Sequence, residues 1–184
     1  MTKYKIAVLV GSLRKQSFNR MIAKALEAAA SESLQFVYSE IGNLPLYNQD
    51  LDESPPAQWV EFRKTISSCQ GVLFVTPEYN RSVPGVLKNA IDVGSRPYGK
   101  SVWDGKPAAV VSVSPGASGG FGANHHLRQC LVFLNMPAMQ QPEAYIGNVA
   151  ELLDEQGQPK KEDTRKFLKK LADAFAAWVQ KHQA

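Results

Sequence analysis

The sequence lacks several features that would assign it to a particular class of protein. Its 184 residues contain two cysteines, Cys69 and Cys130, which form neither a CxxC motif nor a disulfide framework. No apolar run approaches the roughly 20 residues that a membrane-spanning helix needs. The short apolar run near the N-terminus is not followed by the small residues of a signal-peptide cleavage site. We therefore expect a protein of the reducing cytoplasm with no membrane partner.

Strong charge of either sign is also absent. The 21 basic and 17 acidic residues leave a net charge of +4. A basic run between Lys160 and Lys170 includes Glu162 and Asp163, and it lies opposite an apolar helical stripe. No interleaving of basic and aromatic residues indicates a nucleic-acid surface. The run is typical of a solvated helix face, so we expect no nucleic-acid partner.

What the sequence does contain is a regular alternation of strand and helix patterns. The expected strands are 5–10, 34–40, 71–76, 108–114 and a weaker one at 138–145; the expected helices are 17–30, 57–69, 85–94, 124–134 and 160–181. Three of the strands are nearly continuous apolar runs, as in parallel strands covered on both faces. The pattern predicts one α/β domain over 1–184. Its architecture is a three-layer sandwich with helices on both faces of a five-stranded parallel sheet in the order 2-1-3-4-5.

The stretch "VGSLRKQSFNR" follows the first strand and precedes the first helix. In such a sheet, ligands bind beyond the carboxyl ends of the strands, next to this position. The helix N-terminus offers free N–H groups, Ser12, Ser17 and Asn19 add short donors, and Arg14 can bind phosphate oxygens. The P-loop and Rossmann glycine patterns are missing. The stretch therefore favours a terminal phosphate monoester, although a βα turn with an ordinary N-cap serine remains an alternative.

Two more loops follow the third and fourth strands and so lie at the same edge of the sheet. "TPEYNRSVPG" (76–85) is stiffened by Pro77 and Pro84 and carries Tyr79, which can lie against the edge of a flat ring. "SPGASGGFG" (114–122) contains four glycines, which permit close approach of the backbone to a ligand. Together, the phosphate loop and the two ring loops predict a site for flavin mononucleotide (FMN).

The motifs "GSLRKQSFN", "PEYNRSVPGVLKNAID" and "SPGASGGFGANHHLRQ" resemble the NADPH-dependent FMN reductase family, and within it the bacterial quinone reductases, also described as chromate reductases. The resemblance runs from about Lys5 to Tyr145. It implies a flavodoxin-like fold, non-covalently bound FMN, and NADPH or NADH as co-substrate. It also implies reduction of quinones, and of free flavin, azo dyes or chromate, as a protection against oxidative stress. Because nicotinamide and oxidant must use the same open face of the flavin, we expect two-electron ping-pong transfer.

The resemblance also implies which residues bind the cofactor. Those near the phosphate are Ser12, Leu13, Arg14, Lys15, Gln16, Ser17, Phe18 and Asn19; those lining the isoalloxazine are Pro77, Glu78, Tyr79 and Asn80; those closing its other side include Ser114 and Gly116. No catalytic side chain is expected, because the chemistry takes place on the flavin N5. No metal site is expected, because His125 and His126 point about 100° apart on a helix and lack further ligands at i+3 or i+4.

Several interpretations remain open at this point. A one-electron flavodoxin is disfavoured by Arg14, Lys15 and a pI of about 9.0, while a non-catalytic flavin-binding regulator is not excluded. A homodimer or homotetramer is expected from apolar residues of the 41–56 loop (Leu44, Leu46, Tyr47 and Leu51) and from the 125–145 region. His125, His126 and Arg128 could face the flavin or a subunit interface. Cys69 and Cys130 are expected to be buried, and Asp92 to pair locally.

Overall fold

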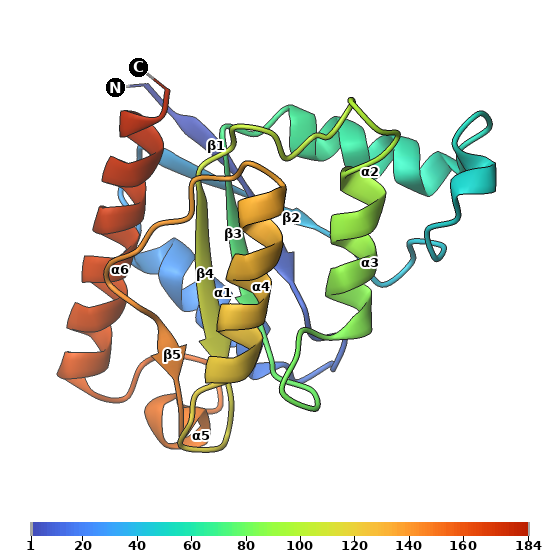
Figure 1. The fold of residues 1–184 in the computed structure, drawn as a ribbon. Coiled ribbons are helices and arrows are strands. Elements are labelled where there is room, and N and C mark those ends of the chain that lie inside the picture. Colours follow the sequence, from blue (N-terminus) through green and yellow to red (C-terminus); the bar gives the residue numbers. More distant parts are fainter. Residues whose placement is uncertain (1, 184) are drawn as a thin grey trace.

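The computed structural model describes residues 2–183, and a parallel sheet forms its centre (Figure 1). The strands are β1 (Tyr4–Val10), β2 (Leu34–Ser39), β3 (Gly71–Thr76), β4 (Ala108–Val113) and β5 (Tyr145–Ile146). They pair in the order β2-β1-β3-β4-β5, and every pair is parallel. The predicted flavodoxin-like order is confirmed.

Helices cover both faces of the sheet. One face packs against α1 (Phe18–Ala29) and α6 (Glu162–Lys181), and the other against α2 (Ala57–Ser67), α3 (Gly85–Gly94) and α4 (Phe121–Phe133). Two short elements, the 3₁₀ turn η1 (Gln49–Leu51) and α5 (Val149–Leu152), lie in the connections and are absent from the sequence-based prediction. No helix in the described part of the chain is long and apolar enough to cross a membrane.

The continuous apolar strands reflect burial on both sides of the sheet. Ile6, Val8 and Val10 contribute to the core under α1 and α6, whereas Ala7 and Leu9 contribute to the core under α2, α3 and α4. Successive side chains of a strand point to opposite faces, so a central strand in three layers needs an apolar residue at every position.

The last strand differs from its prediction. The expected strand at 138–145 reduces to Tyr145–Ile146, and Ala138 makes only an isolated bridge to Ala108. Pro142 interrupts the segment and cannot donate to the β-ladder, so the chain leaves β4 and returns to it at Tyr145. Conversely, α4 begins at Phe121, three residues before its expected start. The preceding Gly120 has φ +74° and ends the loop there.

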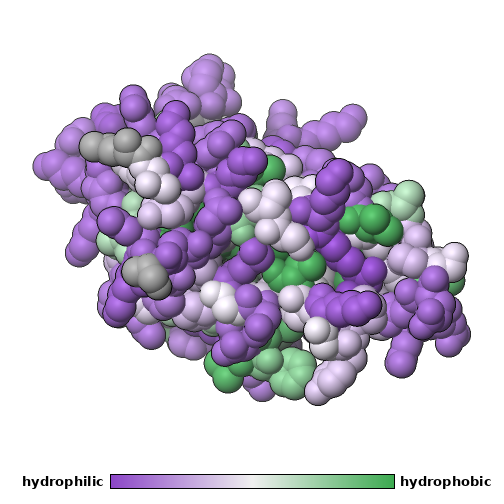
Figure 2. All heavy atoms as spheres, turned by 90° about the horizontal axis from the view of Figure 1, so that it is seen from above, coloured by the Kyte–Doolittle hydropathy of each residue, from purple (hydrophilic) through white to green (hydrophobic). Residues whose placement is uncertain are grey.

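The loops at the carboxyl ends of β1, β3 and β4 meet at one edge of the sheet, the lower edge in Figure 1. The opposite end, seen in Figure 2, is mainly hydrophilic, with hydrophobic atoms confined to small patches. The 41–56 loop lies beside α3, where Asn89 accepts a hydrogen bond from the Tyr47 N–H and donates to the carbonyls of Leu44 and Pro45.

Candidate functional site

The loop between β1 and α1 leaves many backbone donors unused. The N–H groups of Ser12 to Gln16, and of Phe18 and Asn19, donate to no acceptor among residues 2–183. The Ser17 hydroxyl caps α1 by accepting from the Arg20 N–H at 3.3 Å. An unpaired helix N-terminus carries partial positive charge and suits an anion. We call Ser12–Asn19 the anion loop.

The side chains of the anion loop divide into two groups. Ser12, Ser17 and Asn19 are buried, and the Asn19 Oδ1 atom has no hydrogen-bond partner in the described structure. Leu13, Arg14, Lys15 and Gln16 are exposed. An orphaned buried acceptor beside unpaired donors needs a ligand or water that both donates and accepts. FMN does so, because its phosphate oxygens accept and its ribityl hydroxyls donate. The residues of this loop therefore fit that cofactor.

The loop after β3 holds its own shape. Tyr79 and Ser82 exchange backbone hydrogen bonds of 3.1 and 3.0 Å, and Asn80 and Arg81 between them have φ of +52° and +64°. This is the geometry of a tight two-residue hairpin turn. Pro77 is buried at its base, and the Tyr79 ring is 51% exposed at its tip. The exposed ring is thus presented by a rigid turn.

Glu78 joins this loop to α4. One carboxylate oxygen accepts from the Ala123 N–H at 3.0 Å, and the other accepts from the Arg81 guanidinium at 3.0 Å. The Ser82 hydroxyl adds a 2.8 Å hydrogen bond to Nδ1 of His126. Both carboxylate oxygens of Glu78 are therefore engaged within the protein. Its contribution to a site is to hold the two loops together.

The glycine-rich segment that precedes α4 approaches the backbone of β5 closely. Gly119 has φ +60°, and a Cβ atom built there would lie 2.6 Å from the carbonyl carbon of Tyr145. The Gly116 carbonyl accepts from the N–H groups of Gly119 and Asn148, while the Ser114 hydroxyl accepts from the Gly116 N–H. Only a residue without a side chain fits at position 119. We call Pro77–Pro84 and Ser114–Gly122 together the latched loops.

The structure thus brings the anion loop and the latched loops to one edge. Gly11 joins them, because a Cβ there would lie 3.1 Å from both Pro77 and Pro84. The roles of the individual residues toward a flavin stay predictions. Gly11 was not among the predicted site residues. Gly122 is one of the four glycines noted in the loop after β4, but its role, to leave room for Glu78 and Arg81, was not predicted. Both requirements come from a loop that is distant in sequence.

An aromatic cluster beside the latched loops was also missed. Phe121 and His125 lie one helical turn apart on α4 with ring centroids 4.2 Å apart, and Tyr145 of β5 completes the group at 5.2 Å from Phe121. Burial raises the pKa of the Tyr145 hydroxyl, and its hydrogen bond to Glu143 raises that pKa further. The i, i+4 spacing of Phe121 and His125 predicts their contact, but only the fold brings Tyr145 close to these two rings.

Other predicted roles are resolved by local contacts. Arg128 donates to the Asn124 side chain and to the Met139 carbonyl, so it ties α4 to the segment before β5. Asp92 pairs with Lys88 at 2.8 Å, as expected. Cys69 is buried as predicted, but the prediction is wrong for Cys130, which is partly exposed. Cys130 lines a depression between α3 and α4, and burial raises the pKa of both thiols.

Comparison with known proteins adds a family context to this geometry. Residues 4–151 match a model of the family described as NADPH-dependent FMN reductase. The chain is 61% identical to a quinone reductase of Pseudomonas putida over 98% of its length and 97% of that protein. It is 49% identical to a 2-hydroxy-1,4-benzoquinone reductase of a Burkholderia species, covering 96% of each chain. The structure of FerB, a flavoenzyme NAD(P)H:(acceptor) oxidoreductase of Paracoccus denitrificans, superposes with a TM-score of 0.93 at 44% identity, covering 97% of this chain and 98% of that one.

Proposed function

This chain belongs to the NADPH-dependent FMN reductase family, and on that premise we propose that it is an FMN-dependent NAD(P)H:quinone oxidoreductase. The observation that carries the proposal is the anion loop, with its unpaired N–H groups beside the orphaned Asn19 Oδ1. When bound, FMN supplies the chemistry, accepting a hydride from nicotinamide and passing electrons to the oxidant. The protein provides binding and orientation.

In this proposal each segment of the site has a separate task. The buried Ser12, Ser17 and Asn19 would hold the phosphate together with the backbone donors, and the exposed Arg14 would bind its oxygens from the solvent side. The latched loops would flank the isoalloxazine, with Tyr79 and Asn80 on one side and Ser114 and Gly116 on the other. Pro77 and Glu78 support the first of these loops. The remaining predicted phosphate neighbours in the anion loop are Leu13, Lys15, Gln16 and Phe18.

The open face of the flavin determines the kinetic scheme. Phe121 is the one aromatic residue of the glycine-rich segment, and its ring contacts His125 and Tyr145. Besides Phe121, whose ring is engaged in this way, the glycine-rich segment has no aromatic side chain to oppose Tyr79, and a flavin there would not be enclosed between two rings. One face stays accessible to nicotinamide and then to the oxidant. This supports two-electron ping-pong turnover of quinones, with free flavin, azo dyes or chromate as further acceptors, and a protective role against oxidative stress.

The test measures NADPH and NADH oxidation by the purified holoprotein with and without benzoquinone. The enzyme turns the co-substrate over continuously only when quinone is present, and double-reciprocal plots give parallel lines. Heat denaturation releases FMN and no FAD, because the anion loop suits a monoester. Accumulation of a flavin radical during dithionite titration, or cytochrome c reduction that matches quinone turnover, would instead assign the protein to the one-electron carriers.

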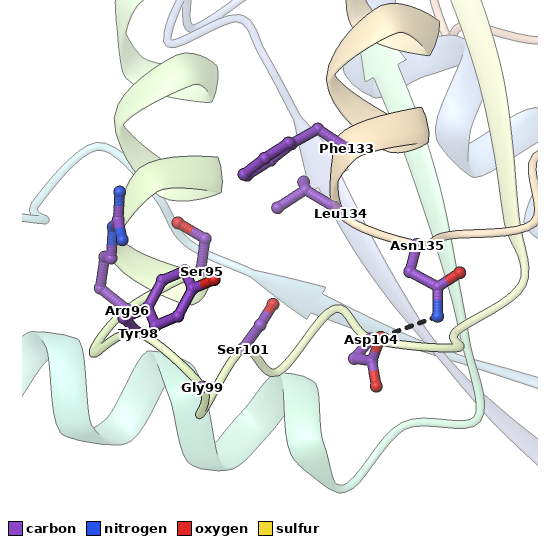
Figure 3. Close-up of a pocket in the computed structure, with 9 residues that line it drawn as sticks. All are labelled: Ser95, Arg96, Tyr98, Gly99, Ser101, Asp104, Phe133, Leu134 and Asn135. Atoms are coloured by element: carbon purple, nitrogen blue, oxygen red, sulfur yellow. Dashed lines mark hydrogen bonds between the residues drawn. The ribbon is translucent and has the colours of Figure 1, made fainter.

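We further propose that the chain forms a homodimer through α3 and α4. Phe133 is 84% exposed at the end of α4, next to a depression of about 420 Å³ shown in Figure 3. A second depression of about 360 Å³ shares its Arg96 and Phe133 lining and extends along the groove to Lys88 and Asp92. A two-fold contact would place the exposed Phe133 ring and the charges of both signs in this groove against the same groove of the second copy.

This surface differs from the one expected from the 41–56 loop. Leu44 is buried against the core and Asn89 fixes its carbonyl, so of the four apolar residues only Leu46 is largely exposed. Sedimentation of the wild-type chain at micromolar concentration yields a dimer or a tetramer, and Phe133→Asp shifts it toward monomer. Leu46→Asp leaves the assembly unchanged. A wild-type monomer contradicts the proposal.

We also propose that the chain acts as one domain in the cytoplasm. Free thiols at Cys69 and Cys130 support a reducing compartment.

A further inference from the structure

A depression of about 680 Å³ lies beside the anion loop, between α1 and the chain that follows β5. The anion loop contributes Arg14, Gln16 and Phe18 to its lining. The rest of the lining comes from α1, from α5 and from the hairpin 153–160. The volume lies in the range of small-molecule sites. We call this cavity the hairpin depression.

The hairpin wall is held in shape by contacts within the chain. The Oδ1 atom of Asp154 accepts from the N–H groups of Gln156 and Gln158 at 2.9 and 2.8 Å. Gly157 has φ +77° and packs against α1, where a Cβ atom built on it would lie 3.0 Å from Cγ of Met21. The wall is therefore formed before any ligand binds, as is usual for small-molecule sites.

The lining of the hairpin depression combines apolar side chains with charges of both signs. Phe18 and Met21 are half-buried, and Leu153 is buried. The Lys160 ammonium group donates to a backbone carbonyl of α5 at 3.3 Å, which leaves two of its three hydrogens for another acceptor. Glu155 is exposed, and its carboxylate accepts no hydrogen bond from residues 2–183. The depression thus offers an apolar surface, one cation and one free acceptor.

The hairpin depression adjoins the segments predicted to hold the two ends of the flavin. It shares Arg14 with the predicted phosphate residues. The Val149 N–H at the start of α5 donates to the Ser114 carbonyl at 3.4 Å, and the Asn148 N–H donates to the Gly116 carbonyl at 3.3 Å. In Figure 1, α5 lies at the same lower edge as the loops of the candidate site. A second ligand in the depression would therefore lie beside the flavin.

We propose that the hairpin depression binds the adenosine half of the nicotinamide dinucleotide, and that Lys160 and Glu155 discriminate between NADPH and NADH. The proposal rests on the proposed function, since it concerns the co-substrate of that same site. A purine ring suits the apolar lining, and the dinucleotide is the reactant that carries a second nucleoside. The Lys160 ammonium group attracts the 2′-phosphate of NADPH. The Glu155 carboxylate repels that phosphate and accepts from the 2′-hydroxyl of NADH.

The experiment follows anaerobic bleaching of the flavin in the holoenzyme by NADPH, by NADH and by reduced nicotinamide mononucleotide, which lacks the adenosine half. Lys160→Gln lowers the ratio of the NADPH and NADH rate constants by about 2- to 5-fold, as for an exposed ion pair. Glu155→Gln raises the ratio by a similar factor. Neither variant changes the rate with the mononucleotide. The matched controls, Lys161→Gln and Glu151→Gln, alter exposed residues outside the depression and leave all three rates unchanged.

A steric variant tests the cavity without changing its charge. Ala150 is an exposed residue of α5 that lines the depression, so an indole in its place fills the space that adenosine needs. Ala150→Trp slows bleaching by both dinucleotides toward the rate of the mononucleotide, while FMN content stays at the wild-type level. Titration calorimetry with adenosine 2′,5′-bisphosphate gives a readout apart from activity. The wild-type holoprotein binds this probe, and Lys160→Gln weakens the binding by about 2- to 5-fold.

Three results would overturn the proposal. The first is an unchanged ratio of rate constants in both charge variants. The second is an equal loss with the mononucleotide or a loss of FMN, because the depression would then serve the flavin and not the adenosine half. The third is a wild-type holoprotein that does not bind the bisphosphate. Failure of the proposed function itself is distinct, because neither dinucleotide would then bleach the wild-type flavin, or benzoquinone would not reoxidise it.

Discussion

The anion loop and the latched loops lie at the same edge of the sheet but are stabilised in different ways. Backbone donors of the anion loop have no partners in the described chain, and its Asn19 Oδ1 is buried without a hydrogen bond. The latched loops are held by Glu78, by the Ser82–His126 contact and by the approach of Gly119 to β5. The anion loop has unpaired polar groups that suit a ligand, whereas the latched loops are held by contacts within the chain.

This difference separates two kinds of sensitivity to mutation. Changes in the latched loops should destabilise the protein whether or not FMN is present, because they break contacts within the chain. Changes in the anion loop should act mainly through FMN binding. The apoprotein and the holoprotein therefore have to be measured side by side.

The largest effect is expected at Gly119. Gly119→Ala should lower the free energy of unfolding by about 3 kcal/mol or more, because a positive φ costs on the order of 1–3 kcal/mol and the overlap with Tyr145 adds to it. Gly116→Ala is the control, since its Cβ meets nothing closer than 3.5 Å. Urea unfolding of the two apoproteins distinguishes them. Equal stabilities would show that the segment can shift away from β5.

Arg14→Ala should weaken FMN binding by about 1.5–3 kcal/mol, the range for hydrogen bonds to charged groups. The stability of the apoprotein should not change, because Arg14 is exposed and makes no hydrogen bond within the described chain. Lys15→Ala should have a smaller effect, because an adjacent residue cannot point into the loop in the same direction. Quenching of flavin fluorescence measures both affinities. Equal losses for Arg14 and Lys15 would contradict this geometry.

Glu78→Ala should lower the stability of the apoprotein by about 1–3 kcal/mol, the cost of leaving the Ala123 N–H without an acceptor. Arg81→Ala removes the exposed partner of the same carboxylate, and surface ion pairs contribute at most about 1 kcal/mol. Chemical denaturation with and without FMN compares the two variants. A loss that appears only in the holoprotein would mean that Glu78 acts on the cofactor and not on the loops.

The smallest effect is expected at Ser17, which should contribute both to the stability of the apoprotein and to FMN binding. Ser17→Ala removes the cap of α1, and this should lower apoprotein stability by about 0.5–2 kcal/mol. It should also weaken FMN binding, because Ser17 belongs to the anion loop and is one of the predicted phosphate residues. Ser17→Thr keeps the oxygen and should restore most of both quantities. Thermal unfolding together with FMN titration tests whether the two losses occur together.

Much of the sheet could be predicted from local patterns. β1, β3 and β4 are apolar at every position, which indicates parallel strands covered on both faces. β5 could not be located in this way, because it has two residues and its neighbour Pro142 breaks the pairing. The length of β5 depends on how many of its residues pair with β4. That pairing is a contact between distant segments, so no short stretch of sequence encodes it.

The candidate site, like the sheet, has parts that local sequence predicts and parts that only the tertiary structure determines. The sequence by itself determined the anion loop, because an apolar strand, a capping serine and a helix start are contiguous and their geometry is local. It also determined that glycine and proline would shape the two ring loops. Only the tertiary structure decided that Glu78 holds α4, that Gly119 must be a glycine and that Tyr145 joins Phe121 and His125. Each of these contacts joins segments separated by at least 20 residues, and their distances depend on the packing of the whole sheet.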